Sequence, residues 1–115
     1  MIRKRKDKNQ KEIVNTLKRI GCKVYDTSDV GGGFPDLVCA YRYLTILIEV
    51  KNKENWYGKK EAHYDTQKTF RATWNGGIVL TATSPDQIIK EIQTLVDYGY
   101  KVAEKVKLLE SNQSG

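Results

Sequence analysis

The 115-residue sequence lacks the hydrophobic segments that mark membrane and secreted proteins. Apolar runs such as Ile46-Leu47-Ile48 are far too short to cross a bilayer. The basic stretch Arg3-Lys4-Arg5-Lys6 is followed by polar residues 7–10, where a signal peptide would have its apolar segment. We therefore expect a cytoplasmic protein with no membrane partner.

Cysteine is also scarce. Cys22 and Cys39 form neither a CxxC pair nor a zinc-finger spacing. This excludes a disulfide framework and a zinc ribbon, and it predicts two reduced, buried thiols. His63 is the only histidine, and it is either an exposed loop residue or a proton donor to a leaving group.

Positive charge is plentiful and unevenly distributed. The chain has 20 Lys or Arg and 14 Asp or Glu, a formal net charge of +6. Residues 1–25 hold nine of the basic and two of the acidic residues. A basic head on a nearly neutral body suits a polyanion such as nucleic acid, although a solubilising tail would have the same composition.

Apolar periodicity and turn residues predict the order α-β-β-β-α-β-α. The fold class is therefore α/β, with a mixed four-stranded sheet flanked by helices, because a crossover helix implies a parallel strand pair. Residues 1–8 are expected to form a basic flexible arm, 9–99 a single domain, and 100–115 a helical extension and tail. The expected elements are a helix over 9–20, strands over 22–25, 37–41 and 45–50, a loop over 52–64, a helix from 65 or 66 to 74, a strand over 78–81, and a helix that Ser84 caps and Gly99 ends.

Three ionisable residues are expected to meet at one end of the second and third strands. Asp36 starts the second strand, and Glu49 and Lys51 share one face of the third because side chains alternate along a strand. A tight hairpin about Tyr43 would pair Asp36 near Val50 or Lys51. Two carboxylates and an ammonium at one place suit a hard dication such as Mg²⁺, and the alternative is a buried ion pair.

These residues match a known pattern. Pro35-Asp36, twelve intervening residues and then Glu49-Val50-Lys51 resembles the signature of PD-(D/E)XK nucleases. Over about residues 10–92 the chain is similar to the VRR-NUC (virus-type replication-repair nuclease) branch, near archaeal-type Holliday junction resolvases. The resemblance implies a restriction-endonuclease-like core and, in a chain this small, a phage-type protein acting in the host cytoplasm.

The resemblance also implies roles for particular residues. Asp36, Glu49 and the Val50 carbonyl would ligate Mg²⁺, for which Mn²⁺ can substitute, and Lys51 would position the attacking water. Glu12 would reach the metal through water, although it could equally be a solvated helix acid. Gln67 would steady Lys51 or the phosphate, although it could equally be a surface residue.

Other residues are candidates for nucleic-acid contact. Basic side chains can meet phosphates, aromatic rings can stack on bases, and glycine-rich loops let a backbone approach a phosphate. The segment 56–64 could also be a lid over the metal or a dimer contact. The nucleic-acid candidates are Arg3, Lys4, Arg5, Lys6, Lys8, Ser28, Trp56, Tyr57, Lys59 and Lys60.

The sequence therefore predicts a Mg²⁺-dependent DNA endonuclease that hydrolyses phosphodiester bonds. A homodimer acting on branched DNA such as a four-way junction is expected, because two strands must then be cut symmetrically. The alternatives are a nucleic-acid-binding module that no longer cleaves, and a nuclease subunit that depends on a helicase or recombination partner.

Overall fold

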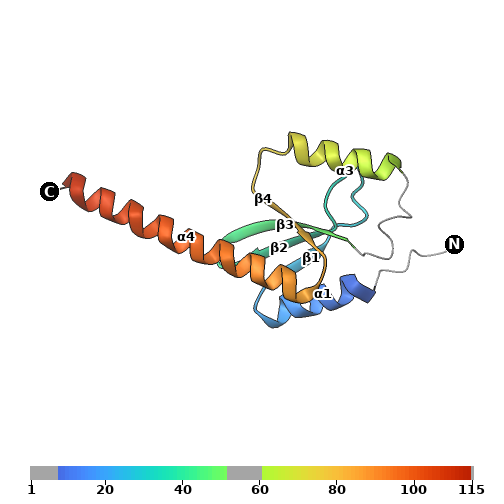
Figure 1. Ribbon diagram of the computed structural model, residues 1–115, viewed down its shortest axis with the longest axis horizontal. Coiled ribbons are helices and arrows are strands. Elements are labelled where there is room, and N and C mark those ends of the chain that lie inside the picture. The colour runs from blue at the N-terminus through green and yellow to red at the C-terminus, as the bar shows by residue number, and fades with distance from the viewer. Residues whose placement is uncertain (1–7, 52–60, 115) are drawn as a thin grey trace.

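The computed structural model describes residues 8–51 and 61–114 and shows an α/β fold. A helix, three strands, a helix, a strand and a helix follow one another, which confirms the predicted order (Figure 1). The elements are α1 (Lys8–Arg19), β1 (Lys23–Asp26), β2 (Leu37–Tyr41), β3 (Leu44–Val50), α3 (Glu61–Thr73), β4 (Ile78–Ala82) and α4 (Pro85–Ser114). Within the described ranges no helix has the length and apolar character needed to cross a membrane.

The four strands form one mixed sheet in the order β1-β2-β3-β4. β2 is antiparallel to both β1 and β3, while β4 runs parallel to β3. The parallel pair follows from the crossover through α3, as the sequence predicted. β3 therefore lies in the interior of the sheet, with a hydrogen-bonded neighbour on each side.

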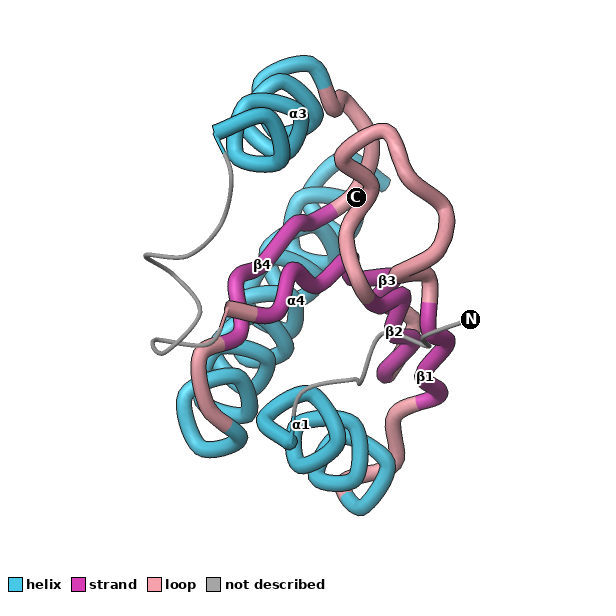
Figure 2. Tube along the Cα trace, turned by 90° about the vertical axis from the view of Figure 1, so that its right-hand side faces the viewer, coloured by secondary structure: helices cyan, strands magenta, loops and turns pink. Residues whose placement is uncertain are grey.

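Helices cover both faces of the sheet. α1 and α4 lie on one face and α3 lies on the other, and the sheet runs between them (Figures 1 and 2). The core lies under α1 and α4, where Ile46, Ile48 and Val50 of β3 are buried. Because side chains alternate along a strand, Glu49 and Lys51 point to the face that α3 covers.

A two-residue turn joins β2 to β3. Arg42 and Tyr43 both have positive φ, 46° and 70°, as a type I′ hairpin turn requires. The sequence predicted a three-residue connection, and the shorter turn shifts the register by one residue. Leu37 pairs with Ile48, so Asp36 comes opposite Glu49 in register rather than opposite Val50 or Lys51.

Two helix boundaries also differ from the prediction. α3 begins at Glu61, so the end of the predicted 52–64 loop is helical and includes His63. α4 continues through Gly99 to Ser114, although Gly99 was expected to end it. A single glycine costs about 1 kcal/mol inside a helix, which good helix formers on both sides can offset.

Local signals account for two other helix ends. Gly21, with φ of 103°, ends α1, and the amide of Cys22 donates to the carbonyl of Leu17 at 3.0 Å as in a Schellman motif. The Ser84 hydroxyl accepts the amide N–H of Gln87 at 3.2 Å, which confirms the predicted cap of α4. Lys8 is the first residue of α1 rather than the last residue of an arm, and residues 1–7 lie outside the described chain.

Both cysteines are free and buried, as predicted. Burial raises the pKa of the Cys39 thiol from about 9 to about 12, and contact with Cys22 adds to the rise. Burial also raises the pKa of the Cys22 thiol, although its hydrogen bond to Cys39 opposes the shift. Both thiols are therefore protonated at neutral pH.

Candidate functional site

The carboxyl end of β3 brings together three of the predicted site residues. Glu49 is only 4% exposed, and its carboxylate Oε1 lies 3.8 Å from the ammonium nitrogen of Lys51. Asp36 Oδ2 accepts the amide N–H of Val50 at 2.9 Å. Asp36, directly before β2, and Glu49 of β3 therefore lie on neighbouring strands at one end of the sheet.

Gln67 of α3 joins Lys51 to Glu49. Its side-chain nitrogen donates to Glu49 Oε1 at 2.7 Å, and its side-chain oxygen accepts a hydrogen bond from Lys51 Nζ. One amide can make both contacts because its nitrogen donates and its oxygen accepts. Gln67 therefore fixes the positions of both charged groups from α3.

Hydrogen bonds between the two ends of the loop 27–36 hold Asp36 in place. The Thr27 amide donates to the Asp36 carbonyl at 2.7 Å, and the Thr27 hydroxyl donates to the Pro35 carbonyl at 2.8 Å. These bonds continue the β1–β2 pairing for one residue beyond β2. The Asp36 backbone therefore extends the β1–β2 ladder at the end of the sheet and is not part of a free loop.

The same loop also packs against α3. Phe34 meets Phe70 edge-on with ring centroids 5.4 Å apart, and Phe70 stacks on Trp74 at 5.1 Å. A Cβ built on Gly33 would lie 2.2 Å from the carbonyl oxygen of Thr66, so only glycine allows this approach. The loop that carries Asp36 and the helix that carries Gln67 therefore form one unit.

α1 reaches the site from the other face. Asn9 Nδ2 donates to the carbonyl oxygens of Lys51 and Thr83, each at 3.2 Å, which ties α1 to the ends of β3 and β4. Gln10 Nε2 donates to Asp26 Oδ2 at 3.3 Å. Neither contact was predicted from the sequence. For Gln10 a signal existed, because it falls on the buried stripe of Ile13 and Leu17.

Glu12 is not brought into this cluster. It is exposed on α1, and in residues 8–51 and 61–114 no group of three or more His, Cys, Asp or Glu side chains could share a metal ion. The reason is helical geometry: Asn9 and Gln10 occupy the part of α1 that meets the sheet end. Among the described residues, no hydrogen bond or ion pair joins Glu12 to the site, so nothing supports the expectation that it supplies a further acid there.

The donor set of the cluster suits a hard dication. Among the described residues, Asp36 Oδ1 accepts no hydrogen bond, so it is available as a ligand beside the Glu49 carboxylate. The N–H and C=O of one strand residue point the same way, so the Val50 carbonyl shares the side on which Asp36 lies. Mg²⁺ is commonly held by one or two carboxylates with several waters, and Asp36 and Glu49 supply two carboxylates here.

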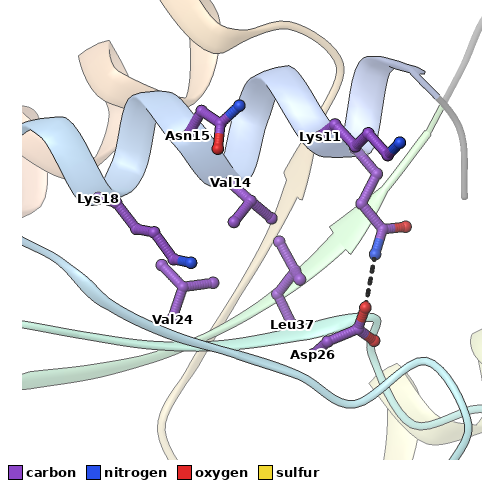
Figure 3. A pocket seen from close by; sticks show the side chains of 8 residues that line it. Lys11, Val14, Asn15, Lys18, Val24, Asp26 and Leu37 are labelled. Atoms are coloured by element: carbon purple, nitrogen blue, oxygen red, sulfur yellow. Dashed lines mark hydrogen bonds between the residues drawn. The ribbon is translucent and has the colours of Figure 1, made fainter.

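A groove with two lysines on its helix wall lies beside α1. It has a volume of about 340 Å³ between α1 and β1, and Lys11, Asn15 and Lys18 line it from the helix (Figure 3). Asp26, which accepts the hydrogen bond from Gln10, lies on the opposite wall (Figure 3). The groove therefore lies along α1 and reaches Asp26, the last residue of β1. The loop that leads to Asp36 begins directly after Asp26.

The other predicted nucleic-acid residues have varied positions. Ser28 is exposed, and both its amide and its hydroxyl donate to Asp26 Oδ1, as in an Asx turn. Lys8 is exposed at the start of α1. Arg3, Lys4, Arg5, Lys6, Trp56, Tyr57, Lys59 and Lys60 lie outside the described residues.

No family model, curated protein or solved structure matches the chain.

Proposed function

We propose that the protein is a divalent-metal-dependent DNA endonuclease built on a restriction-endonuclease-like core. The observation that carries the proposal is the joining of Lys51, Gln67 and Glu49 by hydrogen bonds beside Asp36. Asp36, Glu49 and Lys51 are also the three residues that resemble the PD-(D/E)XK signature. The coarse α/β fold and its strand order are consistent with this core.

Charge and burial support a metal site over a structural ion pair alone. Glu49 and Lys51 are nearly buried, and Asp36 adds a second carboxylate beside them. Burying charge is costly, and an apolar replacement is often as stable as a buried ion pair. Two neighbouring carboxylates are stabilised by a bound dication, and Asp36, Glu49 and the Val50 carbonyl would hold it.

The residues of the chain would divide the work of hydrolysis. A bound Mg²⁺ would supply Lewis-acid stabilisation of the phosphate and a more acidic water. The Lys51 ammonium, held by Gln67, would orient the attacking water and stabilise the negative charge that develops on the phosphate. Gln67 acts through Lys51 and Glu49 and is therefore a positioning residue.

DNA is the substrate that the surface charge supports. Exposed Lys8, Lys11, Lys18 and Arg19 of α1 are followed by exposed Lys23 at the start of β1. Such a cluster suits the phosphate backbone, which carries most of the affinity but little sequence information. We therefore propose that substrate choice depends on DNA shape, with branched DNA such as a four-way junction as the first substrate to test.

One observation favours a second candidate, a nucleic-acid-binding module that does not cleave. Gln67 and Lys51 already satisfy Glu49 Oε1 without any ion. In that case Asp36, Glu49 and Lys51 would serve stability alone.

Mg²⁺-dependent cleavage of linear, nicked, flapped and four-way-junction DNA separates the two candidates. We expect cleavage by the wild type, loss of cleavage in EDTA, and loss of cleavage in Lys51→Ala with DNA binding retained. Lys90→Ala is the control, because Lys90 is an exposed lysine of α4. DNA binding without cleavage by the wild type would favour the second candidate, and undiminished cleavage by Lys51→Ala would contradict the assignment of Lys51.

A further inference from the structure

The second half of α4 extends beyond the rest of the fold. α4 has 30 residues, a length of about 45 Å at 1.5 Å per residue. Its first half packs on the sheet, where Ile88 and Ile92 are completely buried. After Val96 every side chain whose exposure is described is exposed, and the helix projects away from the sheet (Figure 1).

The apolar stripe of the first half continues along this projecting half. The positions alternate in steps of four and three, which is the a/d spacing of a coiled coil. They are Ile88, Ile92, Leu95, Gly99, Val102, Val106 and Leu109. Val102, Val106 and Leu109 are 43%, 47% and 60% exposed, so an apolar seam faces water where the sheet no longer covers it.

We propose that this seam, Gly99 to Leu109, is the contact surface for a second copy of the chain in antiparallel orientation. The sheet allows only one orientation of the partner helix. The sheet covers the same stripe over Ile88 and Ile92, so a parallel partner helix would run into the sheet. An antiparallel partner helix ends where the sheet begins.

Side-chain sizes match in this orientation. In an antiparallel pair centred between Val102 and Val106, Gly99 lies opposite Leu109 of the second copy, and Val102 lies opposite Val106. A Cβ built on Gly99 would have no heavy atom within 4 Å, so this position has room for a large side chain. In a parallel pair two glycines would instead face each other and leave a gap.

The interface is small, so the dimer is expected to be weak and reversible. The seam covers about one and a half heptads, fewer than the three or four of a stable coiled coil, and small interfaces are typical of transient contacts. The dimer does not depend on the proposed nuclease activity. Its test therefore needs neither DNA nor metal, and the two proposals can fail separately.

Sedimentation equilibrium at increasing concentrations of the full chain tests the dimer. Leu109→Asp places a charge in the seam, and Leu108→Asp is the matched control, because Leu108 is similarly exposed at 64% but lies about 100° around the helix. We expect the wild type and Leu108→Asp to dimerise, and the dissociation constant of Leu109→Asp to rise at least about tenfold. A wild type that stays monomeric, or equal effects of the two substitutions, would overturn the proposal.

Crosslinking tests the orientation. Gly99→Cys and Leu109→Cys chains are mixed and oxidised with copper-phenanthroline, which removes the two thiol protons and two electrons as the disulfide forms. In the antiparallel pair the mixture crosslinks and neither variant alone does. Crosslinking of each variant with itself, and not in mixed pairs, would show a parallel dimer and contradict the orientation.

Discussion

Glu49 of β3 and Lys51, which directly follows β3, lie on the same side of the sheet with their charged atoms 3.8 Å apart, and both side chains are nearly buried. This distance is too long for a strong direct hydrogen bond, and Gln67 makes the shorter contacts to both. The geometry of the pair therefore depends on a residue of α3, and this dependence can be tested.

Gln67→Ala should reduce both cleavage and stability. Loss of hydrogen bonds to two charged groups should lower the free energy of unfolding by about 1–3 kcal/mol. Residues that orient metal ligands typically contribute about 10–100-fold to activity or metal affinity, so cleavage should fall by that factor. Urea unfolding and a plasmid-nicking assay measure the two effects.

Gln93→Ala is the control for Gln67→Ala, because Gln93 is exposed on α4. Unchanged metal affinity and unchanged cleavage in Gln67→Ala would show that Gln67 has no role in the site.

Glu49→Gln should separate metal binding from DNA binding. The substitution removes one of two carboxylates, so Mg²⁺ affinity measured by calorimetry should fall. DNA affinity in EDTA should stay the same or rise, because a negative charge near the phosphate is lost. A marked decrease of DNA affinity without metal would mean that Glu49 serves DNA binding in another way.

The lysines of the α1 groove should contribute to the salt dependence of DNA binding. If Lys11 and Lys18 each contact one phosphate, replacing both with alanine should reduce the slope of log affinity against log salt by about 2. Fluorescence anisotropy with labelled duplex DNA measures the slope. Replacement of Lys90 and Lys107, exposed lysines of α4, should leave the slope unchanged, and an equal effect of both pairs would argue against the groove.

Gly33→Ala should destabilise the protein more than Gly32→Ala. Both glycines have positive φ, 80° and 64°, which costs an alanine about 1–2 kcal/mol. Only at Gly33 would the new Cβ meet a backbone atom, the Thr66 carbonyl, and such a clash adds about 1–3 kcal/mol. Thermal unfolding of the two variants compares the costs, and equal melting temperatures would show that the loop does not pack against α3 as described.

Alkaline pH should destabilise the protein through its buried thiols. With a folded-state pKa of about 12, Cys39 keeps its proton above pH 9, where the same thiol in the unfolded chain loses it. The unfolded state then binds fewer protons, so the free energy of unfolding falls as pH rises, by up to about 1.4 kcal/mol per pH unit. Cys39→Ala should show a shallower decline in urea unfolding from about pH 8 to about pH 11, and an identical decline would contradict this cause.

Much of the site could be predicted from sequence because its chemistry lies on one short strand. Alternation along β3 was enough to place Glu49 and Lys51 on one face, and the Pro35-Asp36 pair could be assigned to the start of β2. The register was wrong by one residue, because a turn of two residues and a turn of three are both compatible with Arg42, Tyr43 and Leu44. Only the left-handed backbone of Arg42 and Tyr43 decides between them.

Contacts between distant segments could not be predicted in this way. Asn9 bonds to the carbonyl of Lys51, 42 residues away, and neither periodicity nor local propensity carries information about such a pair. The contact of Gln67 with Lys51 could be expected only from the family resemblance. The continuation of α4 past Gly99 was missed because a glycine stops a helix only where the chain has a better alternative.

The sequence by itself determined the order of helices and strands, the caps at Gly21 and Ser84, and the residues that meet at the end of β3, because these depend on local periodicity and short-range bonding. The tertiary structure decided that α3 closes over Glu49 and Lys51, that Glu12 stays outside their cluster, and that half of α4 extends beyond the sheet. Those outcomes depend on which surfaces pack together, a choice that the free energy of the whole fold makes and that no single segment encodes.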